Sequence, residues 1–129
     1  DLSLVYDEGA GGAVMEVARA SGWPIEEGVL VAVSGPTYET GAELRFYRLI
    51  GGDAVSMSLV PEALAARARD LSITAVSVIT NTWDLRRPLP VSHEEVLATA
   101  EQVAPVLKEV IAVWIGLPRQ GQPPISVEE

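Results

Sequence analysis

Apolar positions along the chain alternate between helical stripes and short continuous runs. Residues 7–21 place their aliphatic side chains on one helical face, and Gly22 is a typical helix stop. Residues 29–33, Val-Leu-Val-Ala-Val, form the unbroken apolar run that is typical of a strand buried on both faces, and Gly35-Pro36 end it. The pattern therefore predicts a helix followed by a buried strand.

The same signals predict the elements that follow. They are a helix over about 40–50, a strand over 54–57, a helix over about 61–70, a strand over 71–80 and a helix over about 93–115. Thr40 with Glu43, and Ser92 with Glu95, have the spacing of helix capping boxes. Pro105 lies inside the last helical pattern and predicts a bend or break there.

Helices and strands thus alternate along the chain, which predicts an α/β layered fold with mostly parallel strand pairing. Three strands make a small sheet, so we expect it to be part of a larger one. Residues 1–116 hold all of these elements. Residues 117–129 contain three prolines without an apolar period, and we expect a mobile tail there.

Composition excludes several classes of function. The chain of 129 residues is 48% apolar and 21% charged, which predicts a folded domain. The net charge of −9, without any run of Lys or Arg, argues against a nucleic-acid partner. No apolar stretch approaches the ~20 residues that span a bilayer, so we expect no membrane partner.

The chain contains no cysteine, which excludes disulfides, thiolate zinc sites and cysteine nucleophiles and fits a cytoplasmic location. His93 is the sole histidine, so a transition-metal site is not expected either. Residue 1 is Asp rather than Met, and we therefore expect that the natural protein does not start there.

Polar side chains follow the predicted strands, where open α/β sheets bind small molecules. Glu39 is either an acidic residue favoured by the following helix or an acceptor for the N1–H and amine of a 6-oxopurine. Asn81 is either a turn residue or an amide that matches purine N7 and O6. A donor at N7 would stabilise the negative charge that builds on a purine as its glycosidic bond breaks.

Four further side chains have two interpretations each. Met57 either fills the core or lines a ribose, and Ser58 is a turn hydroxyl or a donor to phosphate or sugar. His93 lies in a capping box and has no Ser/Asp partner pattern, so it is a surface histidine or a contact to substrate. Trp83 is either a loop anchor or part of a lid.

The order of these motifs resembles one known family. Val-Ser-Gly-Pro-Thr-Tyr-Glu-Thr-Gly-Ala-Glu-Leu-Arg, Gly-Gly-Asp-Ala-Val-Ser-Met-Ser-Leu-Val-Pro-Glu, Ser-Val-Ile-Thr-Asn and Ser-His-Glu-Glu-Val-Leu follow one another along the chain. Together they resemble the C-terminal half of the trimeric, low-molecular-mass purine nucleoside phosphorylases, over about residues 1–115. The resemblance implies a three-layer α/β/α fold with a mixed, mostly parallel sheet, of which residues 1–116 are the C-terminal portion.

The resemblance also implies a role for seven side chains. Tyr38 would pack on the purine, Glu39 and Asn81 would hold it, Met57 would contact the ribose, Ser58 would contact phosphate, His93 would approach the ribose 5′-hydroxyl, and Val96 would line the same region. Asn81 and His93 are the catalytic candidates. The implied reaction is reversible phosphorolysis of inosine- and guanosine-type nucleosides and their deoxy forms. It needs no cofactor or metal, takes inorganic phosphate as co-substrate, and takes place in a homotrimer.

Two departures from the family pattern limit this interpretation. Ser56 stands where the family has glycine before Met57, and the half that carries the glycine-rich phosphate loop has no counterpart here. We therefore expect little activity from the isolated chain, because catalysis needs phosphate held in place. The alternatives are a non-catalytic or truncated purine-binding module and a nucleosidase that uses water.

Overall fold

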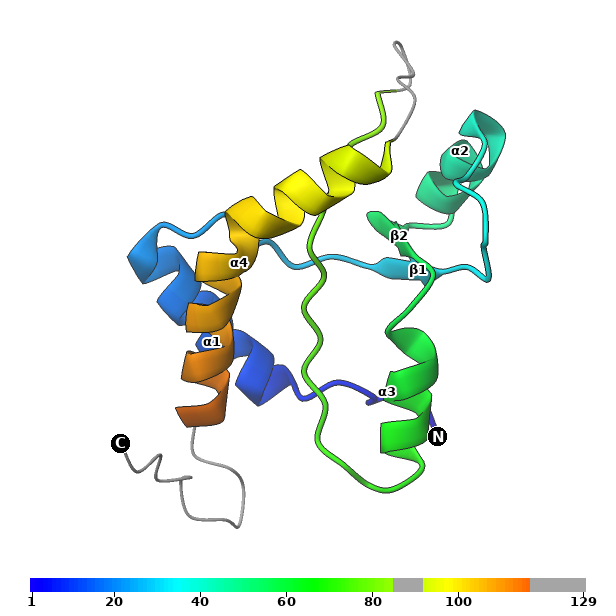
Figure 1. The fold of residues 1–129 in the computed structure, drawn as a ribbon. Coiled ribbons are helices and arrows are strands. Elements are labelled where there is room, and N and C mark those ends of the chain that lie inside the picture. Colours follow the sequence, from blue (N-terminus) through cyan, green and yellow to red (C-terminus); the bar gives the residue numbers. More distant parts are fainter. Residues whose placement is uncertain (85–91, 117–129) are drawn as a thin grey trace.

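The computed structural model describes residues 1–84 and 92–116. Its elements follow one another as α1 (Glu8–Ser21), β1 (Leu30–Ala32), α2 (Gly41–Leu49), β2 (Ala54–Ser56), α3 (Val60–Arg67) and α4 (His93–Gly116) (Figure 1). The alternating α/β order that the sequence predicts is confirmed for these elements. The expected tail over 117–129 lies outside the described residues, as does much of the loop that precedes α4.

The helices begin and end at the residues that local chemistry favours. Asp7 caps α1 by accepting a 3.0 Å hydrogen bond from the Ala10 N–H, and Gly22 ends it in the left-handed region at φ 68°. Thr40 and Glu43 form the expected reciprocal capping box at the start of α2. These helix limits therefore follow from short-range sequence signals.

Strands β1 and β2 form a two-stranded parallel sheet. Leu30 pairs with Ala54, Val31 with Val55, and Ala32 with Ser56. The Val33 N–H extends the ladder by a 3.0 Å bond to the Ser56 carbonyl. Because the strands are parallel, the segments that follow Val33 and Ser56 leave the sheet at the same edge.

The third strand predicted over residues 71–80 is not formed, and that prediction is wrong for this structure. The segment runs extended past the sheet in Figure 1. Its Ile73 carbonyl accepts a 2.8 Å bond from the Asp7 N–H, but residues 74–80 make no backbone hydrogen bond to another described residue. The β-branched composition favours an extended chain, whereas a strand also needs a partner at ladder distance.

The apolar core of the described residues lies mainly between α1 and α4. Val14, Met15 and Ala18 of α1 are buried together with Val110 of α4. Helix α4 continues through Pro105 and changes direction along its length in Figure 1, which agrees with the expected bend.

Many large apolar side chains stay outside this core. Sixteen of them are exposed in the described part of the chain, and Leu49 at the end of α2 reaches 83%. Exposed apolar surface of this extent is typical of a face that another polypeptide covers. None of the helices in the described ranges has the length and apolar character that crossing a bilayer requires.

Candidate active site

The loops that follow β1 and β2 meet closely at the common edge of the sheet. Gly35 has φ 59°, and the side chain of Met57 fills the space that a Cβ on Gly35 would need. Both the conformation and the close approach therefore require glycine at this position. Met57 itself remains 43% exposed, so it lies beside the loop that carries Tyr38 and Glu39 rather than in the core.

Two serine hydroxyls are joined just beyond the end of β2. The Ser58 N–H donates a 3.2 Å hydrogen bond to the Ser56 Oγ, and the two hydroxyl oxygens are 3.3 Å apart. Leu59 follows at φ 77° and starts α3 without a side-chain cap. The turn thus points Ser58 at the edge where the strands end.

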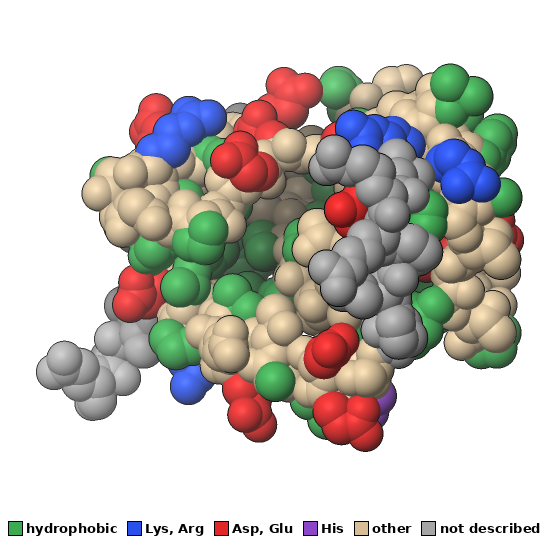
Figure 2. Space-filling model, turned by 90° about the horizontal axis from the view of Figure 1, so that it is seen from above, with side chains coloured by type: hydrophobic (Ala, Val, Ile, Leu, Met, Phe, Trp, Pro, Cys, Tyr) green, Lys and Arg blue, Asp and Glu red, His purple; other side chains and the backbone are tan. Residues whose placement is uncertain are grey.

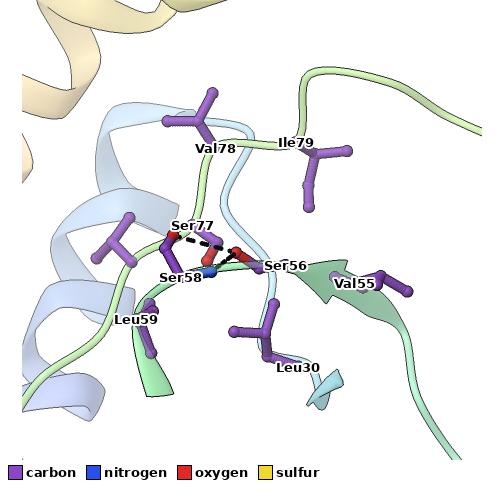
Figure 3. Close-up of a pocket in the computed structure, with 10 residues that line it drawn as sticks. Leu30, Val55, Ser56, Ser58, Leu59, Ser77, Val78 and Ile79 are labelled. Carbon is purple, nitrogen blue, oxygen red and sulfur yellow. Dashed lines mark hydrogen bonds between the residues drawn. The ribbon is translucent and has the colours of Figure 1, made fainter. Parts of the chain in front are cut away.

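A pocket of about 230 Å³ separates this turn from the extended segment over 71–80. Its lining comes from β1, from β2 and the turn after it, and from residues 76–79. Figure 3 shows the side chains of Ser56, Ser58 and Ser77 gathered in one part of it, with apolar side chains around them. Of the seven candidate side chains, Ser58 is the one that lines this pocket.

Tyr38 and Glu39 lie immediately before α2. Tyr38 is 54% exposed, and Glu39 is half-buried without a hydrogen-bond or ion-pair partner among the described residues. Glu43 accepts hydrogen bonds of 2.7 Å from both the hydroxyl and the N–H of Thr40, and these bonds lower the pKa of the Glu43 carboxyl. The capping box thus uses Glu43, and the Glu39 carboxylate stays available to a ligand.

Asn81 follows the extended segment with its amide oxygen engaged. The Thr80 hydroxyl donates a 2.9 Å hydrogen bond to the Asn81 Oδ1. Both residues are half-buried. Because the amide oxygen already accepts, the Asn81 NH₂ group remains as a donor for a ligand.

His93 and Val96 lie in the first turn of α4. The Ser92 Oγ accepts a 3.2 Å hydrogen bond from the Glu95 N–H, as the expected cap requires. His93 is exposed, whereas Val96 is half-buried.

Comparison with known proteins places all of these candidate residues in a region that one family shares. The sequence model described as the phosphorylase superfamily matches residues 1–114, which include all seven of them. The chain belongs to the phosphorylase superfamily. The family and the fold that the motif order implies are thereby confirmed.

Related phosphorylases are considerably longer than this chain. Purine nucleoside phosphorylase 1 of Bacillus subtilis is 40% identical over 114 residues, which are 88% of this chain and 42% of the relative. Purine nucleoside phosphorylase of Mycobacterium tuberculosis is 42% identical over 101 residues, covering 75% of this chain and 38% of that protein. The chain thus spans less than half the length of these curated relatives.

Solved phosphorylase structures share the fold of this chain. Schistosoma mansoni purine nucleoside phosphorylase in complex with inosine has a TM-score of 0.85 at 35% identity, over 92% of this chain and 44% of that one. A Schistosoma purine nucleoside phosphorylase in complex with hypoxanthine has a TM-score of 0.86 at 36% identity, over 92% of this chain and 44% of the other.

Within this phosphorylase fold, the described structure brings some candidates together and leaves others apart. Met57 reaches the Gly35 loop that continues into Tyr38 and Glu39. Ser58 lies in the pocket and bonds to Ser56, whereas His93 lies at the start of α4, and no hydrogen bond joins the two among the described residues.

Sequence reasoning missed two features of the site. Ser77 joins the serine hydroxyls of the pocket, although nothing in the β-branched run around it predicts this. The indole ring of Trp83 lies against Gly41, the first residue of α2. A glycine at a helix start, where better helix formers are available, was the one signal that could have indicated a close contact.

Proposed function

We propose that this chain supplies the base- and ribose-binding side of a purine nucleoside phosphorylase. The enzyme would cleave inosine- and guanosine-type nucleosides, including deoxy forms, reversibly to the free base and ribose 1-phosphate. The observation that carries the proposal is the match to the phosphorylase superfamily over residues 1–114. Relatives named purine nucleoside phosphorylase, and solved relatives in complex with inosine, guanosine or hypoxanthine, support the substrate class.

The base would be held between Glu39 and Asn81. The Glu39 carboxylate, half-buried and without a partner in the described structure, would accept the purine N1–H. The free NH₂ group of Asn81 would donate to N7, where negative charge develops as the glycosidic bond breaks. That hydrogen bond strengthens in the transition state and therefore accelerates the reaction.

The sugar and phosphate would meet the remaining candidates. Tyr38 would pack on the base and Met57 on the ribose, and both are sufficiently exposed to do so. His93, with Val96 beside it, would approach the 5′-hydroxyl from the start of α4. Ser58 would donate to phosphate, which attacks C1′ as the base leaves with the bonding electrons.

The finer properties of the enzyme are part of the same proposal. Inorganic phosphate is the co-substrate, and no organic cofactor or metal takes part. The complete protein forms a homotrimer in the cytoplasm and serves purine salvage. These properties follow from the family resemblance.

The rest of the phosphorylase fold would come from polypeptide outside these 129 residues. The relatives are more than twice as long as the region they share with this chain. Figure 2 shows a hollow in one face with apolar side chains around it, and residues 74–80 lack a backbone partner in the described structure. A strand from the remaining polypeptide would satisfy the backbone groups of this segment and enlarge the sheet.

A phosphorolysis assay tests the proposal. Inosine and phosphate are supplied to the chain alone and to the chain joined with the remaining part of the phosphorylase fold. We expect phosphate-dependent release of hypoxanthine from the joined protein and little from the chain alone. Release of base without phosphate would instead establish a nucleosidase.

A purine-binding module without catalysis is the second candidate. The feature that favours it is that, among the seven candidates, the resemblance gives a role toward phosphate to Ser58 alone. Calorimetric titration of the joined protein with hypoxanthine distinguishes the two functions, since a module binds the base without turning over inosine. Phosphate-dependent turnover would rule this second candidate out.

A further inference from the structure

We infer that Trp83 is a positioning residue, whose indole ring on Gly41 sets the separation between the Glu39 and Asn81 segments. The inference rests on the proposed function, because it concerns how the distance between the two base-binding side chains is held constant. It extends that function to a residue that contacts neither base nor sugar.

The contact between Trp83 and Gly41 is close and directional. A Cβ placed on Gly41 would lie 2.7 Å from the Cζ2 and 2.8 Å from the Cη2 of the Trp83 ring. Real Cβ atoms are essentially never found closer than 3.0 Å to a heavy atom outside their own residue and its chain neighbours. The absence of a side chain at residue 41 is therefore what lets the indole lie against the start of α2.

Backbone conformation does not explain the glycine. Gly41 is the first residue of α2, and its φ lies outside the positive range that favours glycine. Glycine in a helix is less favourable than alanine by about 1 kcal/mol. A Cβ at residue 41 would enter the space that the Trp83 ring occupies, so this contact, rather than the backbone conformation, is what an alanine would disturb.

The contact links the two segments that carry the base-binding candidates. Glu39 lies two residues before Gly41, and the capping box of Thr40 and Glu43 fixes the backbone between them. Asn81 lies two residues before Trp83, and its amide is held by Thr80. The indole thus connects short, locally fixed stretches from distant parts of the chain.

A lid would place the ring differently. Trp83 is half-buried, and its ring rests on the start of α2. Side chains that hold reacting groups within a fraction of an ångström increase the reaction rate by large factors, because small displacements from the productive geometry lower that rate strongly. The geometry thus favours the anchor over the lid.

The test is a double-mutant cycle in the joined phosphorylase, with Gly41→Ala, Trp83→Leu and both together. We expect Gly41→Ala to raise the KM for inosine about tenfold and to leave the KM for phosphate within about twofold. On the Trp83→Leu background the added Cβ meets a smaller side chain, so Gly41→Ala should change the inosine KM by less than about twofold. Additive effects, or equal changes in both KM values, would overturn the inference.

Matched controls come from the same chain. Gly12 lies in α1 with nothing within 4 Å of an added Cβ, so Gly12→Ala should leave both KM values unchanged. Trp114→Phe in α4 controls for loss of an indole elsewhere. A change in inosine KM in either control as large as that of Gly41→Ala would also overturn the inference.

A spectroscopic readout separates this inference from the proposed function. In a joined protein with Trp23→Phe and Trp114→Phe, and with Phe in place of any tryptophan of the added polypeptide, the remaining tryptophan emission comes from Trp83. Gly41→Ala should shift this emission to the red and increase its quenching by acrylamide. An unchanged spectrum would show that the ring does not rest on Gly41, even if the enzyme cleaves inosine. If inosine is not cleaved, the proposed function fails, while weaker hypoxanthine binding with the red-shifted spectrum would still support the positioning role.

Discussion

The Ser72 Oγ donates a 2.7 Å hydrogen bond to the Asp7 Oδ2, across 65 positions of sequence. The other carboxylate oxygen of Asp7 caps α1 through the Ala10 N–H, and the Asp7 N–H donates to the Ile73 carbonyl. One residue thus fixes both the start of α1 and the extended segment that follows α3. The Ala10 N–H and, to a lesser extent, the Ser72 hydroxyl lower the pKa of the Asp7 carboxyl.

Replacing Asp7 by Ala should therefore destabilise the fold. The lost helix cap alone predicts a loss of about 1 kcal/mol in the free energy of unfolding. Urea unfolding followed by circular dichroism measures it. Asp70→Asn is the matched control, because the contact of Asp70 with Arg67 is 3.5 Å long, its side chain is 93% exposed, and Asn tolerates the left-handed backbone of residue 70 (φ 53°), so loss of the charge should cost little. Equal destabilisation by both variants would contradict the role of Asp7.

Low pH should weaken the hydrogen bonds that the Asp7 carboxylate accepts from Ala10 and Ser72. Because the folded pKa of Asp7 lies below its unfolded value of about 3.9, its stabilisation is present above that pH and is lost as the pH falls through the folded pKa. Asp7→Asn does not titrate, so its free energy of unfolding should fall less steeply than that of the wild type below about pH 4. Parallel urea-unfolding profiles from pH 6 to pH 3 would refute this expectation.

Ser56→Gly should affect the phosphate side of the proposed reaction. The change removes the acceptor that holds the Ser58 N–H and the hydroxyl beside it. We expect the KM for phosphate to rise about threefold to tenfold in the joined phosphorylase, as for a lost hydrogen bond worth about 1 kcal/mol. Ser77→Ala, in the same pocket but without a hydrogen bond to Ser58, should have a smaller effect. An unchanged phosphate KM in Ser56→Gly would show that Ser56 does not orient Ser58.

Asn81→Ala should reduce catalysis more than binding. Loss of a preorganised donor to the leaving purine predicts a decrease in kcat/KM for inosine equivalent to about 2–4 kcal/mol. Steady-state phosphorolysis measures this loss. Thr80→Val removes the hydroxyl that donates to the Asn81 amide oxygen, and we expect a smaller decrease in kcat/KM for this variant. Cleavage at the wild-type rate by Asn81→Ala would remove Asn81 from the mechanism.

Local signals predicted much of this fold. The cap residues Asp7, Thr40 and Ser92 act within three or four positions of themselves, so the helix starts could be derived from the sequence. Strands β1 and β2 could be predicted for the same reason, as short apolar runs bounded by turn residues.

Features that depend on distant partners could not be predicted in this way. Residues 71–80 have the composition of a strand, but pairing is a property of two segments, and no ladder partner for residues 74–80 lies in the described structure. The contact of Trp83 with Gly41 likewise joins positions far apart in the chain, and no periodic pattern encodes it. Motif order indicated the seven candidate residues, whereas their roles stay predictions that the assays above decide.

The register of β1 and β2 determines where the side chains that follow the two strands lie. Ala32 pairs with Ser56, so Gly35 faces Met57, and Ser58 follows on the turn to α3. A slip of one residue would invert every side chain across the sheet. It would place Ser58 where Met57 now meets Gly35 and would move the methionine to the other face. If Met57 and Ser58 take the roles proposed for them, a misaligned copy would present a hydroxyl to the sugar and a thioether to the anion. Correct strand pairing during folding would then be a condition of substrate recognition.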